Sequence, residues 1–172
     1  MNETQQIRPA GTAVLAPAAG LAQAVTAIGS GAQMIDLWRA GRGTADSVRA
    51  RYPDIPLCAR AQWAPLTRDP AAALRTGAVL ICAGTAAAGR AEAAGISRGQ
   101  VLVEAPPAAA AGLLAAGWAV IVTADDRAGP HAAAAVGAIA CWLGAAAVRT
   151  GQVAAVRRAI DMTRAIRGES AP

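Results

Sequence analysis

The sequence contains no lysine and no phenylalanine, and it has only one histidine and one tyrosine in 172 residues. All 16 basic residues are therefore arginines, which excludes Schiff-base chemistry and any phosphate site that depends on lysine. The single histidine, His131, excludes a metal site built from several histidines. Aromatic side chains for base stacking are scarce and the arginines are scattered from Arg8 to Arg167, so we expect no nucleic-acid partner.

Cysteines and long apolar runs are also scarce. Cys58, Cys82 and Cys141 are an odd number at wide spacing, which argues against a disulfide framework and a structural zinc site. We predict no metal and no cofactor, with Cys58 and Cys82 as buried small hydrophobic residues. No run of about 20 strongly apolar residues is present, so we predict no membrane span. Residues 12–32 resemble a signal peptide only superficially, since Pro17 and several glycines interrupt them, and a cytoplasmic location is expected.

What is abundant is alanine, which makes up much of the 55% hydrophobic share. Alanine buries little apolar area, so the core must depend on the larger aliphatic residues and the four tryptophans. A thin core favours burial of some apolar surface against another subunit. The net charge of +5 fits either a small anionic ligand or a composition that is simply rich in arginine.

Short apolar runs alternate with alanine-rich stretches, such as 21–30 and 107–116, that can form helices. Most of the runs lack polar alternation, which is typical of strands buried on both faces of a parallel sheet. Glycines that stand just before several runs are typical helix ends. About seven strands are predicted, against eight in a complete barrel, so the sheet is either a barrel lacking one unit or open and doubly wound. The predicted strands are 12–16, 33–37, 56–61, 78–83, 101–104, 119–123 and 145–150.

One domain is expected, spanning 12–168 between a flexible N-terminal segment, 1–11, and a short tail, 169–172. Its last helix is the clearest, because apolar residues recur from Val153 with a period near 3.6 and Gly168 ends it.

Several segments, in continuous order, resemble dihydropteroate synthase. They are similar to the family's first helix and second strand, its third and fourth strands, its sixth strand, its penultimate helix, and its last strand and helix. The resemblance implies an α/β fold, a shortened TIM-like (β/α) barrel that lacks the family's fifth strand and the neighbouring helix. The segments are AQAVTAIGSGAQMIDL (22–37), IPLCARAQWAPLTRDPAAALRTGAVLICAGTA (55–86), AAGISRGQVLVEAPP (93–107), HAAAAVGAIACWLGA (131–145) and GAAAVRTGQVAAVRRAIDMTRAIRG (144–168).

The resemblance also implies that most of the family's ligand-binding side chains are replaced. That family holds a pterin ring and a diphosphate with polar groups at the C-terminal strand ends, the usual active-site face of a barrel. The matching positions have lost the family's asparagines, its lysine and its histidine, so we predict negligible synthase activity. The replacements are Ala16 on the first strand, Arg60 on the third, Cys82-Ala83 on the fourth, Ala124-Asp125-Asp126 on the seventh and Gly151-Gln152 after the last.

A few charged residues remain as candidates for ligand binding. Glu104 retains the carboxylate of the sixth strand, and Arg149 retains the arginine of the last strand. Arg60 is expected to pair with Glu104 across the barrel mouth, and Asp125 and Asp126 complete the candidate set. We predict no catalytic residue among them.

The function expected from this resemblance is that of a pseudoenzyme, a dihydropteroate synthase-like protein that acts by binding an anionic or pterin-like ligand or another protein. Two alternatives stay open: a divergent but active pterin-binding synthase of folate biosynthesis, or a barrel enzyme of changed chemistry that uses Glu104, Asp125 or Asp126 with Arg149. The resemblance further implies a homodimer through the last two helices. Its apolar candidates are Val136, Ile139, Trp142 and Leu143.

Overall fold

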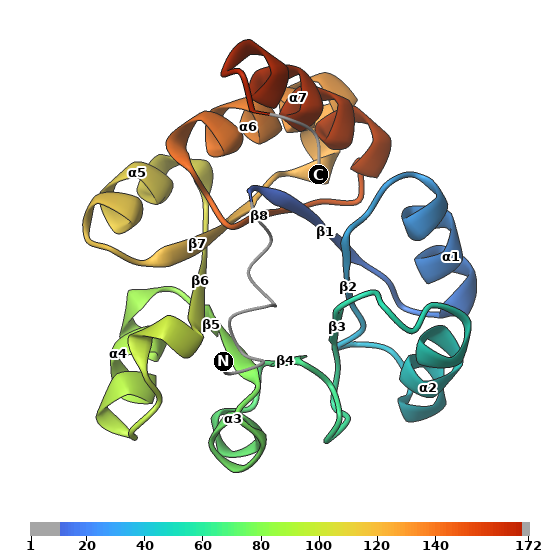
Figure 1. The fold of residues 1–172 in the computed structure, drawn as a ribbon, viewed down its shortest axis with the longest axis vertical. Helices are drawn as coiled ribbons and strands as arrows, with labels where there is room; N and C mark the ends of the chain where they lie inside the picture. Colours follow the sequence, from blue (N-terminus) through green and yellow to red (C-terminus); the bar gives the residue numbers. More distant parts are fainter. Residues whose placement is uncertain (1–10, 170–172) are drawn as a thin grey trace.

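Eight parallel strands close into a barrel in the computed structural model, which describes residues 11–169 (Figure 1). Each strand pairs with its neighbours in sequence, and the last closes on the first. The strands are β1 (Ala13–Pro17), β2 (Met34–Asp36), β3 (Leu57–Cys58), β4 (Leu66–Thr67), β5 (Val79–Ala83), β6 (Val101–Ala105), β7 (Ala119–Thr123) and β8 (Ala147–Arg149).

Among residues 11–169, seven α-helices are present, and they surround the barrel (Figure 1). Two short 3₁₀ turns, η2 (Arg98–Gln100) and η3 (Asp126–Ala128), precede β6 and α6. The predicted flexible segment falls on residues 1–10, and most of the predicted tail on 170–172, which lie outside the described residues. The helices are α1 (Leu21–Gly29), α2 (Arg42–Arg51), α3 (Pro70–Thr76), α4 (Thr85–Ala93), α5 (Pro107–Ala115), α6 (Gly129–Leu143) and α7 (Val153–Ile166).

The predicted TIM-like barrel is confirmed, with eight strands where about seven were predicted, but the expectation that the fifth strand is missing was wrong. The strand that sequence reasoning missed is β4, whose two residues lie between the predicted strands 56–61 and 78–83. With β4 counted, Val79–Ala83 is the fifth strand, so the fourth-strand positions assigned to Cys82 and Ala83 were also wrong. What the chain lacks is a helix between β3 and β4, because every other connection contains one.

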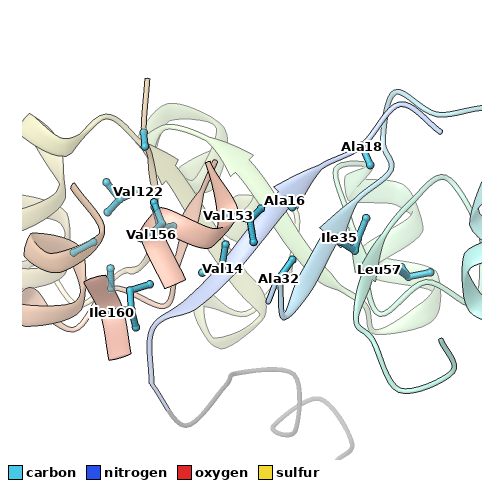
Figure 2. Packing of buried hydrophobic residues seen from close by; sticks show 14 of the residues in the cluster. Val14, Ala16, Ala18, Ala32, Ile35, Leu57, Val122, Val153, Val156 and Ile160 are labelled. Carbon is cyan, nitrogen blue, oxygen red and sulfur yellow. The ribbon is translucent and has the colours of Figure 1, made fainter. Parts of the chain in front are cut away.

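The core forms two shells, one inside the barrel and one between the strands and the helices. Figure 2 shows part of the outer shell, where Val14 and Ala16 of β1 lie beside Val153 and Val156 of α7. The close approach of α6 to α7 depends on a glycine: a Cβ added at Gly137 would lie 2.9 Å from Val156 Cγ1.

The inner shell is built in layers from alternate strands, as in other (β/α)₈ barrels. The even-numbered strands contribute one aliphatic layer and the odd-numbered strands the next layer toward the mouth. The first consists of Met34, Leu66, Leu102 and Ala147, and the second of Leu15, Cys58, Ile81 and Ile121.

Candidate functional site

The next layer toward the C-terminal mouth is made of charged side chains. Asp36, Arg68, Glu104 and Arg149 come from the ends of β2, β4, β6 and β8, each two residues beyond a member of the even-strand aliphatic layer. Because strand side chains alternate between the two faces, this spacing turns all four toward the barrel axis. Acidic and basic residues therefore alternate around the mouth, and we refer to these four residues as the charged ring.

Every neighbouring pair in the charged ring is an ion pair. Arg68 places Nη2 3.0 Å from Asp36 Oδ2 and Nη1 2.7 Å from Glu104 Oε2. Arg149 Nε lies 3.2 Å from the same Asp36 oxygen and 3.5 Å from Glu104 Oε1. The two carboxylates and two guanidinium groups neutralise one another without a ligand.

Local hydrogen bonds hold the carboxylates in place. The backbone N–H of Trp38 donates to Asp36 Oδ1 at 3.0 Å, in a turn directly after β2. Thr123, at the end of β7, donates its hydroxyl to Glu104 Oε1 at 3.1 Å. With these contacts, both oxygens of each ring carboxylate accept a hydrogen bond or contact a guanidinium nitrogen.

A short turn positions Arg68 just after β4. The Asp69 N–H donates to Thr67 Oγ1 at 3.1 Å, and Asp69 Oδ1 accepts from the Ala71 N–H at 2.9 Å, capping α3. Burial works to lower the pKa of the Arg68 guanidinium, but its hydrogen bonds and ion pairs with Glu104 and Asp36 raise this pKa overall. Arg68 is therefore fixed as a cation.

Cys58 belongs to the odd-strand aliphatic layer beneath the charged ring and is fully buried. Burial raises the pKa of its thiol far above the usual value, and the negative charge of Asp36 raises it further, while Arg68 partly opposes this. A thiol held in its protonated form is a poor nucleophile, so this cysteine acts as a packing residue.

Of the predicted ligand-binding residues, Glu104 and Arg149 lie within the charged ring. The predicted pairing of Arg60 with Glu104 was wrong, because Glu104 pairs with Arg68 and Arg149. Arg60 instead lies over the indole ring of Trp38, with its guanidinium carbon 5.0 Å from the ring centroid. It is exposed because it is two residues beyond Cys58 and thus one odd-strand layer above the charged ring.

Sequence reasoning missed Arg68 and the part that Asp36 plays in the ring. Asp36 lies in the segment 22–37 that resembles the family's second strand, but the sequence does not show which side chain it faces. Arg68 follows Leu66 by two residues, which is the spacing of every ring member, but that signal has meaning only if β4 is recognised as a strand.

Asp125 and Asp126 are exposed and engaged in backbone contacts around η3. Asp125 Oδ1 accepts from the Arg127 N–H at 3.0 Å, capping the turn. Asp126 accepts from the Thr150 hydroxyl at 2.7 Å and from the Gly151 N–H at 2.8 Å. These contacts tie the turn before α6 to the connection between β8 and α7, so Asp126 is already committed to a structural role.

A cavity of about 940 Å³ opens over β6, β7 and β8 at the mouth. Its polar wall includes Glu104, Asp125, Asp126 and Arg149, together with two arginines that no predicted site included. Those arginines are Arg39, from the loop after β2, and Arg127. Pro106, Pro107, Ala132 and Val136 form its apolar wall.

Arg39 and Arg127 are exposed, and among the described residues neither has an ion-pair partner. The cavity therefore offers two guanidinium groups without ion-pair partners beside an apolar wall. Of its carboxylates, Glu104 is paired with arginines, whereas Asp125 and Asp126 accept hydrogen bonds but have no ion-pair partner among the described residues. This arrangement suits the binding of a small anion with an apolar body better than acid–base catalysis. No three His, Cys, Asp or Glu side chains come together as a possible metal site within residues 11–169.

The residues predicted for dimerisation lie on α6. Ile139 and Trp142 are 59% and 61% exposed, and Leu143 is exposed as well, whereas Val136 packs partly against the outer shell and lines the mouth cavity. The described part of the chain contains no helix of the length and hydrophobicity needed to cross a membrane.

Taken together, the closed parallel barrel and the charged layer at its C-terminal mouth define a TIM-type (β/α)₈ protein. No protein-family model matches the sequence, and a search of curated proteins gave no match. Solved structures do match over most of the chain. One is Rv1207 of Mycobacterium tuberculosis, at 24% identity and a TM-score of 0.74, covering 95% of this chain and 94% of that chain.

Two other matches are dihydropteroate synthases. The enzyme of Xanthomonas albilineans, in complex with 7,8-dihydropteroate, matches at 13% identity and a TM-score of 0.75, covering 94% of each chain. The enzyme of Yersinia pestis matches at 17% identity and a TM-score of 0.74, covering 92% of this chain and 94% of that chain. The chain has the dihydropteroate synthase fold.

Proposed function

We propose that this protein is a divergent, non-catalytic member of the dihydropteroate synthase family that binds a small anionic ligand at its barrel mouth. The charged ring is the observation that supports this proposal. At the level of the barrel where ligand-binding groups are expected, two carboxylates and two arginines satisfy one another. A pterin could bind at this level of the barrel only by breaking these ion pairs, because few other polar groups face the barrel interior there.

A synthase assay tests the loss of activity. Purified protein is incubated with a hydroxymethylpterin diphosphate and p-aminobenzoate, with the Yersinia pestis enzyme as positive control, and pteroate is measured. We expect no product above the rate without protein. Product at a rate comparable with that of the control enzyme would overturn the proposal and establish an active synthase of folate biosynthesis.

Binding is tested separately by thermal shift with phosphate, p-aminobenzoate and a pterin, since a ligand of the native state raises its melting temperature. We expect the two anions to stabilise the protein through Arg127, and Arg127→Gln to reduce the shift. Arg158→Gln, an exposed arginine outside the mouth cavity, is the matched control and should leave the shift unchanged. Equal shifts in the two variants would exclude the mouth cavity as the site.

A barrel enzyme of changed chemistry is the second candidate, because Glu104 and Arg149 line a cavity large enough for a substrate. Against it, each of these groups is paired within the charged ring. Glu104→Gln distinguishes the barrel enzyme from the non-catalytic binding protein. If the native protein turns over a substrate and the variant does not, the enzyme is favoured. In a non-catalytic protein, the variant loses only stability.

We also propose that the protein forms a homodimer through α6 and α7. Five of the eight exposed large apolar side chains of the described residues lie on these two helices, and a second copy of the same surface would cover them. They are Ile139, Trp142, Leu143, Met162 and Ile166.

Light scattering after size exclusion tests this proposal. We expect a dimer for the native protein and a monomer for Ile166→Glu, since a charge would be buried in the proposed interface. The control is Leu74→Glu on α3, also an exposed aliphatic residue but far from the last two helices in sequence and fold. A native protein that is monomeric at every accessible concentration would exclude the dimer.

A further inference from the structure

A second cavity, of about 300 Å³, lies beside the one connection that has no helix. The segment that joins β3 to β4 packs against α2: the indole N–H of Trp63 donates to Asp46 Oδ1 on α2 at 3.1 Å. The cavity between this segment and α2 shares no lining residue with the mouth cavity. It is a separate feature, next to the position that lacks a helix.

The cavity has an apolar floor and a charged rim. Leu37, Ala45 and Ala59 are buried and form part of the floor. Trp63, which is 42% exposed, forms an aromatic wall, and the guanidinium carbon of Arg49 lies 5.0 Å from the centroid of its ring. An apolar or aromatic group of modest size would therefore find contacts on the floor and on the wall.

Two opposite charges line this cavity without neutralising each other. Asp46 uses one carboxylate oxygen for Trp63, and Arg60 lies over Trp38. Within residues 11–169 neither Asp46 nor Arg60 has an ion-pair partner, although both line the same cavity. The charged ring shows the opposite arrangement, because there every charge is paired.

We propose that this cavity binds a small zwitterion, a free α-amino acid with an apolar side chain. Its ammonium group would contact Asp46, its carboxylate would contact Arg60, and its side chain would lie on the apolar floor against Trp63. A simple anion is disfavoured by Asp46 and a simple cation by Arg60, whereas a molecule with both charges satisfies both residues. A guanidinium already stacked on an indole is held in place for a carboxylate, which reduces the entropy lost on binding.

Thermal shift with each of the twenty free L-amino acids tests the proposal. We expect leucine and phenylalanine to raise the melting temperature by about 3–6 °C at about ten times Kd. Phenethylamine and 3-phenylpropionate, which keep the aromatic ring but carry one charge each, should produce no comparable shift. Comparable shifts from either single-charge probe, or no shift with any of the twenty into the tens of millimolar range, would overturn the proposal.

Two conservative variants locate the site. Asp46→Asn keeps an acceptor for the Trp63 indole, and Arg60→Gln removes a charge from an exposed position, so both should fold. Each should weaken amino-acid binding at least about tenfold, because each removes one charged contact. Arg127→Gln in the mouth cavity is the control and should bind the amino acid normally. Unaltered affinity in both Asp46→Asn and Arg60→Gln would refute the assignment, and this result is independent of whether the mouth cavity binds an anion.

Discussion

Replacing Asp36 with asparagine tests the charged ring most directly. Asp36 is 5% exposed, and its Oδ2 contacts both ring arginines, at 3.0 Å and 3.2 Å. Asparagine keeps the shape and can still accept from the Trp38 N–H, so the change removes mainly a charge. Two guanidinium groups would then share only Glu104.

The expected cost follows from burial. Removing one partner of a buried ion pair costs about 3–5 kcal/mol. The side chains of Arg68 and Arg149 are 18% and 26% exposed, so water recovers part of their solvation. We expect Asp36→Asn to lower the free energy of unfolding by about 2–3 kcal/mol, measured by urea unfolding followed by circular dichroism, with an unchanged m value.

The matched control is Asp161→Asn on α7. Asp161 Oδ2 lies 2.8 Å from Arg157 Nε, as close as the pairs of the ring, but its side chain is 44% exposed. An exposed pair of this kind contributes at most about 0.5 kcal/mol. A double-mutant cycle between Asp36→Asn and Arg68→Gln should give a coupling energy of about 1–3 kcal/mol. Equal effects of Asp36→Asn and the control, or zero coupling in the cycle, would refute our interpretation of the ring.

Two further predictions concern packing and pH. Gly137→Ala should destabilise the protein by about 1–3 kcal/mol, because the added Cβ would meet Val156. Gly89→Ala on α4, where nothing lies within 4 Å of the added Cβ, should stabilise it by up to about 1 kcal/mol. Urea unfolding of both variants measures their stabilities, and a Gly137→Ala protein more stable than Gly89→Ala would contradict the prediction. The Cys58 thiol has a raised pKa in the folded state, so it stays protonated there while the unfolded chain ionises, and stability should fall as pH rises past about 8.5. Unfolding between pH 7 and pH 10 should show a smaller loss of stability in Cys58→Ala; an identical pH dependence would disprove the link.

Much of the fold could be predicted because its strands are buried on both faces. Seven apolar runs, most of them without polar alternation, correspond to seven of the eight strands, and the order of strands and helices predicted the parallel arrangement. β4 could not be found in this way, because two residues between Pro65 and the polar turn at Arg68 form no recognisable run. The missed strand then led us to assign Val79–Ala83 as the fourth strand.

The candidate site was harder to predict, because it depends on pairing across the barrel. Glu104 and Arg149 were found by resemblance to a family, at the ends of strands that the apolar runs predicted. Which residues face each other depends on the register between strands, and a strand that is not counted shifts every assignment around it. Arg60 was given a partner that the layered geometry assigns to Arg68, since Arg60 lies one layer too high.

The charged ring also has a consequence for how this chain reaches a single fold. The two aliphatic layers of the barrel interior are built mostly from Leu, Ile and Met side chains of similar volume, so they discriminate poorly between alternative alignments of neighbouring strands. Moving any even-numbered strand by one position would turn its ion outward and leave an odd number of charges in the barrel interior. Four ions above these aliphatic layers therefore specify the alignment of half the strands, in addition to the packing beneath them.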